Sequence, residues 1–210
     1  MNKAFIFDFD GTLVDSELAI YECFQHITKQ LAPQRIKIAQ NVLIGPPLKQ
    51  TVAEILGSPD HPLIEKFVSS FIQMHDEEVL KHTTSYPHAH NTLKKLYQQG
   101  VKMAIATNKR VAPTQKIINY FHWGKFFVKV ECSDSTQTAR SKNEMIRTII
   151  SADSDFKKSY FIGDTIGDAL SANNYDLSFI KANYGYGRNQ DWSKVKISLS
   201  IDNFSELINL

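Results

Sequence analysis

From residue 86 onward, short apolar runs alternate with segments whose apolar residues recur at helical spacing. The apolar runs predict strands over residues 101–106 (VKMAIA), 126–132, 159–162 (SYFI) and 177–181. The intervening segments predict helices over residues 89–99, 113–121, 142–151 and 169–174, with a last strand and a short closing helix over 198–210. Alternation of this kind is typical of an α/β fold in which helices cover both faces of a parallel sheet.

A block of helices interrupts this alternation directly after the first strand. Residues 4–9 (AFIFDF) form a short apolar run that ends in acids, as a buried strand running into a loop would. Helical spacing then holds over residues 16–31 and 35–82, broken only at turns rich in Gly and Pro. This pattern predicts two domains: a Rossmann-like core of residues 1–15 and 85–210, and an inserted helical cap of residues 16–84.

Polar residues gather at the carboxyl ends of the predicted strands. Ligands of an open parallel sheet bind beyond these ends, so the residues there are the candidate site. They are Asp8, Asp10, Gly11 and Thr12 after the first strand, Thr107 and Asn108 after the second, Asp164 and Asp168 after the fourth, and Lys142 at the start of the helix before the fourth. We therefore expect four carboxylates and one ammonium group to meet at one edge of the sheet.

Carboxylates held this close together need a counter-charge. Two of them at about 4 Å repel by roughly 4 kcal/mol at an effective dielectric constant near 20. Such a site either raises the pKa of several groups or holds a cation. The donors are oxygen atoms without His or Cys beside them, which favours Mg²⁺ over Zn²⁺.

Four short segments resemble a known family. Residues 8–16 (DFDGTLVDS) resemble the first motif of the haloacid dehalogenase-like phosphohydrolases, and residues 163–168 (GDTIGD) resemble the fourth. Thr107 and Lys142 resemble the second and third motifs. The resemblance covers the whole chain, including the helical cap, and is nearest to the phosphoglycolate phosphatase-like branch. It implies a phosphatase that depends on Mg²⁺.

The resemblance also implies a role for each candidate residue. Asp8 would attack the phosphorus and form an aspartyl-phosphate, and Asp10 would act as acid and then as base. Thr107 and Lys142 would bind phosphoryl oxygens, with Gly11 and Asn108 also beside the substrate. The implied Mg²⁺ ligands are Asp8, the main-chain carbonyl of Asp10, Asp164 and Asp168, the last either directly or by orienting a bound water.

Asp10 favours phosphate chemistry over dehalogenation, because a halide leaving group needs no proton and dehalogenases of this family lack an acid there. It does not exclude a sugar-phosphate mutase, and a pyrophosphatase or nucleotidase also stays open. A non-catalytic binding module on the same scaffold would have lost a motif residue, and none is missing. The expected substrate is a small phosphorylated metabolite, with phosphoglycolate as the first candidate.

Two basic residues have alternative interpretations. Lys142 precedes Asn143, where relatives usually have Pro, and Arg140 is close enough in sequence to compete for its role. Residues 45–48 (GPPL) resemble a cap loop that reaches toward the active site in phosphoglycolate phosphatase-like relatives. Lys49, which follows this loop, would either meet a substrate anion or lie exposed at an ordinary turn.

Charge and cysteine content indicate the surroundings of the protein. The net charge of +2 gives no electrostatic case for nucleic acid or a membrane as partner. No apolar run approaches the roughly 18 residues of a spanning helix, and the segment before Asp8 is too short for a signal peptide. Cys23 and Cys132 are expected to be buried and reduced. We expect a cytoplasmic protein, and the sequence leaves its oligomeric state unknown.

Overall fold

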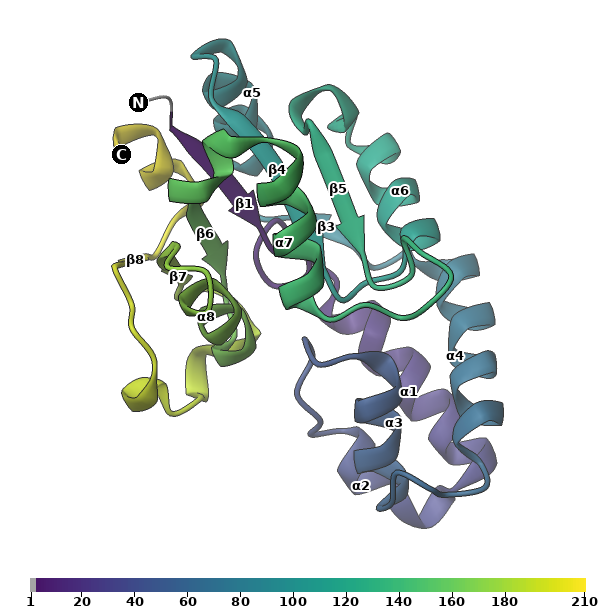
Figure 1. The fold of residues 1–210 in the computed structure, drawn as a ribbon. Coiled ribbons are helices and arrows are strands. Elements are labelled where there is room, and N and C mark those ends of the chain that lie inside the picture. The colour runs from purple at the N-terminus through teal and green to yellow at the C-terminus, as the bar shows by residue number, and fades with distance from the viewer. Residues whose placement is uncertain (1–2) are drawn as a thin grey trace.

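The computed structural model describes residues 3–210, with one parallel sheet at its centre (Figure 1). Its six strands lie in the order β5-β4-β1-β6-β7-β8, and every neighbouring pair is parallel. Their bounds are β1 Ala4–Phe7, β4 Lys102–Thr107, β5 Lys129–Cys132, β6 Tyr160–Gly163, β7 Ser178–Ala182 and β8 Leu199–Ile201. Because β1 lies between β4 and β6, the chain that follows β1 emerges at the middle of the carboxyl edge.

The two faces of the sheet belong to different hydrophobic cores. Phe5 and Phe7 of β1 join one core, and Ala4 and Ile6 join the other, because successive side chains of a strand point to opposite faces. The first core is covered by α5 (Ala89–Gln98), α6 (Val111–Tyr120) and the 3₁₀ helix Phe204–Asn209, and the second by α7 (Lys142–Ala152) and α8 (Ile166–Asn173). Helices on both faces of a parallel sheet confirm the predicted fold class.

A separate group of helices lies beside the sheet (Figure 1). Its members are α1 Glu17–Leu31, the 3₁₀ turn Pro33–Arg35, α2 Ile36–Ala39, α3 Leu48–Leu56 and α4 Ile64–Glu78. Phe24, Phe67 and Phe71 pack together within this group, with Phe24 and Phe71 ring centroids 4.6 Å apart. The group therefore has a hydrophobic core of its own, as an inserted unit requires.

A short antiparallel pair joins the helical group to the sheet domain. β2 (Val14–Asp15) pairs with β3 (Thr84–Ser85), so the chain enters and leaves the helical group through neighbouring strands. The sequence does not predict this pair, because two residues are too few to show alternation. The pair spans the positions where the sequence divides core from cap, and that division stays a prediction. Residues 1 and 2 of the predicted core lie outside the described residues.

Local interactions explain where the predicted bounds differ. α8 begins at Ile166 rather than Ala169, because Thr165 and Asp168 form a reciprocal capping box at its start. β5 begins at Lys129 because the chain just before it forms a 3₁₀ turn. The remaining 3₁₀ helices are Gly124–Phe126, Ser154–Lys158, Tyr186–Asn189 and Trp192–Lys194.

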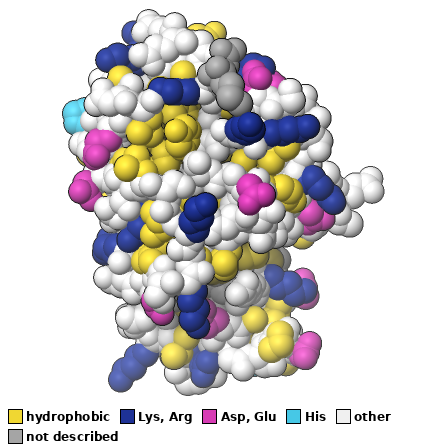
Figure 2. All heavy atoms as spheres, turned by 60° about the vertical axis from the view of Figure 1, so that its left-hand side comes forward, with side chains coloured by type: hydrophobic (Ala, Val, Ile, Leu, Met, Phe, Trp, Pro, Cys, Tyr) yellow, Lys and Arg dark blue, Asp and Glu magenta, His cyan; other side chains and the backbone are white. Residues whose placement is uncertain are grey.

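Charged side chains of both signs are spread over the face shown in Figure 2, where Lys and Arg are interspersed with Asp and Glu. This mixture matches the small net charge of +2. Within residues 3–210, no helix is both long enough and apolar enough to cross a membrane. Cys23 and Cys132 are buried and unpaired.

Candidate active site

The loop after β1 brings Asp8 and Asp10 to the carboxyl edge of the sheet. The Asp8 N–H donates to the Ile162 carbonyl of β6 at 2.8 Å, so the sheet itself holds Asp8. The Phe9 carbonyl then accepts from the Leu13 N–H at 2.8 Å and closes a tight turn. This turn ends β1 two residues before the predicted bound of the strand and contains Asp10.

Three buried carboxylates meet beyond β1 and β6. Oxygen atoms of Asp8, Asp164 and Asp168 lie within 4.8 Å of one another, and all three residues are buried. Lys142, at the first turn of α7, donates to Asp8 Oδ1 at 2.7 Å and also to Asp168 Oδ1. One ammonium group thus faces three carboxylates, so the cluster is negatively charged when all three are ionised.

The pKa values of these groups reflect burial and the excess of acid. Burial raises the pKa of Asp8 to about 7, although Lys142 acts in the opposite direction. Burial, with Asp168 and Asp8 beside it, raises the pKa of Asp164 well above its ordinary value. Burial disfavours the charge of Lys142, but Asp168 and Asp8 outweigh burial and raise the pKa of Lys142. A cation bound to Asp8 and Asp164 would favour their ionised forms.

Asp164 is enclosed by the backbone of two loops. The Thr12 hydroxyl donates to its Oδ1 at 3.1 Å, and the Tyr186 N–H donates to its Oδ2 at 2.7 Å. A Cβ on Gly11, whose φ is +82°, would lie 2.3 Å from Asp164 Oδ2, and a Cβ on Gly185 would lie 2.2 Å from Asp164 Cβ. Only glycine fits at either position, which explains why the loop after β7 contains Gly185.

The Asp10 carboxylate has other partners. Its Oδ1 accepts from Lys109 Nζ at 2.9 Å and from the Ser16 hydroxyl. Lys109 is 9% exposed, and its Nζ also lies 3.5 Å from Nε2 of His75 in α4. The sequence does not single out Lys109, although its position directly after Asn108 was an available signal. The role of Asp10 as a metal ligand through its main-chain carbonyl stays a prediction.

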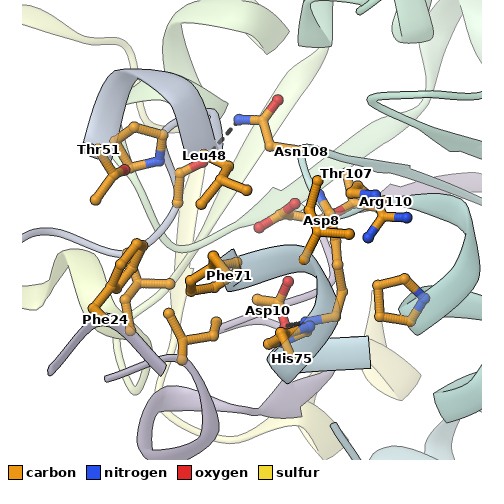
Figure 3. Close-up of a pocket in the computed structure, with 17 residues that line it drawn as sticks. Asp8, Asp10, Phe24, Leu48, Thr51, Phe71, His75, Thr107, Asn108 and Arg110 are labelled. Atoms are coloured by element: carbon orange, nitrogen blue, oxygen red, sulfur yellow. Dashed lines mark hydrogen bonds and ion pairs between the residues drawn. The ribbon is translucent and has the colours of Figure 1, made fainter. Parts of the chain in front are cut away.

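Thr107 and Asn108 connect the end of β4 with the helical group. The Thr107 Oγ1 atom is buried and accepts from the Lys109 N–H at 3.1 Å. Asn108 Nδ2 donates to the Gly45 carbonyl at 2.8 Å, as the dashed line that starts at Asn108 in Figure 3 shows. The loop before α3 therefore touches a residue predicted to bind substrate.

The structure shows where the basic residues with alternative interpretations lie. Lys142 lies at Asp8, whereas Arg140 pairs with Glu131 on β5. Lys49 is exposed and bonds to Glu65 at 2.7 Å, so it has the position of an ordinary surface lysine.

A cavity of about 90 Å³ lies between the sheet edge and the helical group (Figure 3). Asp8, Asp10, Thr107 and Asn108 line it from the sheet domain. Helices α1, α3 and α4 supply side chains to the other wall. Asp8 and Asp10 thus share one space that a small ligand can enter.

Comparison with known proteins identifies the family. Residues 5–182 match the model of the haloacid dehalogenase-like hydrolases, and the chain belongs to that family. Its curated relatives include a phosphoglycolate phosphatase of Psychrobacter arcticus, 25% identical over 97% of this chain and 93% of the relative. They also include pyrophosphatase PpaX of Bacillus velezensis, 28% identical over 81% of this chain and 78% of the relative.

Solved structures agree with the fold. A haloacid dehalogenase-like hydrolase from Bacteroides fragilis matches with a TM-score of 0.86 at 21% identity, over 99% of this chain and 100% of that one. The family and its phosphatase relatives together confirm the predicted enzyme class, a phosphoric monoester hydrolase.

Proposed function

We propose that this chain is a Mg²⁺-dependent phosphatase that hydrolyses a small phosphorylated metabolite through an aspartyl-phosphate at Asp8. The observation that carries the proposal is the buried cluster of Asp8, Asp164 and Asp168, with Lys142 bonded to two of the three. Asp8 also lines the cavity. Asp8 can therefore meet a ligand in the cavity, and Lys142 connects it to Asp168.

The donor set fits Mg²⁺. Within residues 3–210 the cluster consists of carboxylates without His or Cys, and hard oxygen donors suit this ion. We assign the carboxylates of Asp8 and Asp164 and the main-chain carbonyl of Asp10 as ligands. Both carboxylate oxygens of Asp168 already accept hydrogen bonds, which suits a role in orienting a ligand. When bound, Mg²⁺ offsets the negative charge of the carboxylates and the phosphate.

The reaction then consists of two displacements at phosphorus. An Asp8 oxygen bonds to phosphorus as the bond to the alcohol oxygen breaks, and Asp10 gives that oxygen a proton. Asp10 next takes a proton from water as the water oxygen displaces Asp8 and inorganic phosphate forms. Lys142 and Thr107 stabilise the charge on the phosphoryl oxygens. Lys109, bonded to Asp10 at 2.9 Å, orients the Asp10 carboxyl group.

The helical group is proposed to act as a cap that selects the substrate, because α1, α3 and α4 line the cavity opposite Asp8. The names of the relatives alone make phosphoglycolate the first candidate substrate, since several are phosphoglycolate phosphatases, but the lining of the cavity favours another alcohol group. Inorganic pyrophosphate is the second, since one relative is a pyrophosphatase. The unpaired Cys23 and Cys132 support a location in the reducing cytoplasm.

Hydrolysis of p-nitrophenyl phosphate tests the function. Activity is measured with Mg²⁺, after addition of EDTA, and after Mg²⁺ is restored, and we expect turnover only when the metal is present. Asp8→Asn should lower kcat by at least about a thousandfold. Asp60→Asn, at an exposed position outside the cavity, is the matched control and should keep wild-type activity. Turnover that survives EDTA, or that persists in pure Asp8→Asn, would refute the mechanism.

A further inference from the structure

The cavity beside Asp8 changes character from one side to the other. Asp8, Asp10 and Thr107 form a polar end. The opposite side is a largely apolar wall, to which Thr51 adds a hydroxyl; its apolar members are Ile20, Phe24, Ile44, Leu48, Phe71 and Ile72. Figure 3 shows Phe24, Leu48 and Phe71 on the side of the cavity away from Arg110. A bound phosphate ester would therefore have its phosphate and its alcohol group in opposite surroundings.

The cationic side chains among the described lining residues already have anionic partners. Lys109 Nζ lies 2.9 Å from Asp10 Oδ1. Arg110 Nη1 donates to both oxygens of Asp76, at 3.0 and 2.9 Å, and its Nε lies 3.4 Å from Asp134. Arg110 is thus held by two carboxylates. Lys109 is held beside Asp10 at the polar end of the cavity.

His75 and Lys49 add no charge to the apolar wall. His75 is buried in α4, and burial together with the neighbouring cations lowers its pKa to about 2, so its ring is neutral at physiological pH. Lys49 follows Leu48 directly but is exposed and bonded to Glu65. It is not among the described residues that line the cavity. The helical group thus offers hydrophobic surface without an available cation.

Such a wall discriminates strongly between alcohol groups. Burying an ionised carboxylate without a partner is highly unfavourable, because the low-dielectric surroundings do not replace its hydration. Each CH₂ group moved from water to an apolar wall instead improves binding about fourfold. The kcat/KM of a phosphate ester should therefore rise with the apolar length of its alcohol group. It should fall when that alcohol group carries a negative charge in addition to the phosphate.

We propose that the substrate is the phosphate monoester of a small, uncharged and largely apolar alcohol, whose carbon atoms pack against Phe24, Leu48 and Phe71. This inference rests on the proposed phosphatase function and narrows its substrate class. The cavity volume of about 90 Å³ suits a small alcohol group. Phosphoglycolate places a carboxylate close to the apolar wall, so it should be a poor substrate despite the names of the relatives.

A matched set of phosphate esters tests the proposal. kcat/KM is measured with Mg²⁺ for methyl, propyl and butyl phosphate, and isobutyl phosphate is compared with phosphoglycolate, which is similar in size but carries a carboxylate. We expect a rise of about fourfold per added methylene until the cavity is filled. Isobutyl phosphate should exceed phosphoglycolate by at least about tenfold.

The outcomes separate this inference from the proposed function. A flat alkyl series, or phosphoglycolate ahead of isobutyl phosphate, overturns the substrate class while the phosphatase function stands. If p-nitrophenyl phosphate and every other ester stay intact with Mg²⁺ present, the phosphatase function fails, and the inference fails with it.

Substitutions at Leu48 test the apolar wall directly. Leu48→Ala should lower the ratio of kcat/KM for butyl over methyl phosphate by about tenfold. Leu48→Lys supplies a free cation at the half-buried first position of α3 and should shift preference toward phosphoglycolate. Lys49→Ala, one residue along but outside the cavity, is the matched control and should keep the wild-type ratios.

Folding of each variant is checked by circular dichroism and urea unfolding. If Leu48→Lys does not fold, Ile72→Lys places the cation on the same wall from half-buried Ile72 of α4. An unchanged butyl-to-methyl ratio in folded Leu48→Ala overturns the proposal, because it shows that the wall does not contact the substrate.

Discussion

Replacing His75 by glutamine should make the protein less sensitive to acid. His75 is 4% exposed, and its ring stacks on Phe71 with centroids 5.3 Å apart. Burial, with Lys109 and Arg110 as the next largest causes, lowers the pKa of His75 from 6.5 to about 2. Asp76 lies 3.9 Å from Nδ1, but Arg110 already binds its carboxylate. The folded protein therefore holds a neutral imidazole through the whole mildly acidic range.

The sign and size of the effect follow from proton linkage. Below pH 6.5 the unfolded chain takes up a proton at His75 that the folded chain does not, so the free energy of unfolding falls as pH falls. Integrated from about pH 7.5 to about pH 5, this single group removes about 2 kcal/mol of stability. The loss continues toward the folded pKa of about 2. Glutamine keeps a polar amide at the site without a titrating ring.

Urea unfolding across this pH range measures the effect. The difference in free energy of unfolding between wild type and His75→Gln should change by about 2 kcal/mol between about pH 7.5 and about pH 5, in favour of the variant at low pH. His26→Gln, at an exposed position of α1, controls for loss of an imidazole as such. If the difference between wild type and His75→Gln changes by less than about 0.5 kcal/mol over this pH range, folded His75 accepts a proton. The apolar wall would then have a cation, contrary to the reasoning above.

Three further substitutions test the site. Lys142→Met should abolish turnover and lower the free energy of unfolding by about 3–5 kcal/mol, because two buried carboxylates lose their partner. Arg140→Gln should retain turnover. Enzyme kinetics and urea unfolding measure both variants. Asp10→Asn should lower kcat about 100- to 10,000-fold on an alkyl phosphate. The loss should be much smaller on p-nitrophenyl phosphate, because its leaving group needs little protonation. Equal losses on both esters would argue against Asp10 as the acid. Gly11→Ala puts a Cβ 2.3 Å from Asp164 Oδ2. The variant should have a lower Tm and need a higher Mg²⁺ concentration for half-maximal activity. A wild-type Tm together with a wild-type Mg²⁺ requirement would contradict the enclosure of Asp164.

The sheet was predictable because its strands are continuous apolar runs bounded by turn residues. β4 and β6 lie within one residue of their predicted bounds. The pairing of residues 14–15 with residues 84–85 was not predictable, because two-residue strands carry no periodicity and this pair joins segments far apart in the chain. The start of α8 was missed because the capping box of Thr165 and Asp168, rather than the apolar pattern, sets that boundary.

The candidate acids were predictable for a related reason. Asp8 and Asp164 directly follow strands, and Lys142 opens a helix, so topology alone brings them to one edge. The bond between Lys109 and Asp10 spans 99 positions and depends on how the turn after β1 aims one carboxylate. The apolar wall likewise depends on three helices whose orientation toward the sheet leaves no trace in local sequence.

The position of β1 also affects how the protein is made. β1 lies at the centre of the sheet, and its Phe5 pairs with Met103 on one side and Tyr160 on the other. At about 5–20 residues per second, a ribosome needs roughly 8–30 s to travel from the first of these positions to the last. Throughout that interval the apolar strand that leads into Asp8 lacks at least one of its two neighbouring strands. The segment that carries the nucleophile is thus synthesised early and enclosed late, so the active site assembles only when most of the chain has been translated.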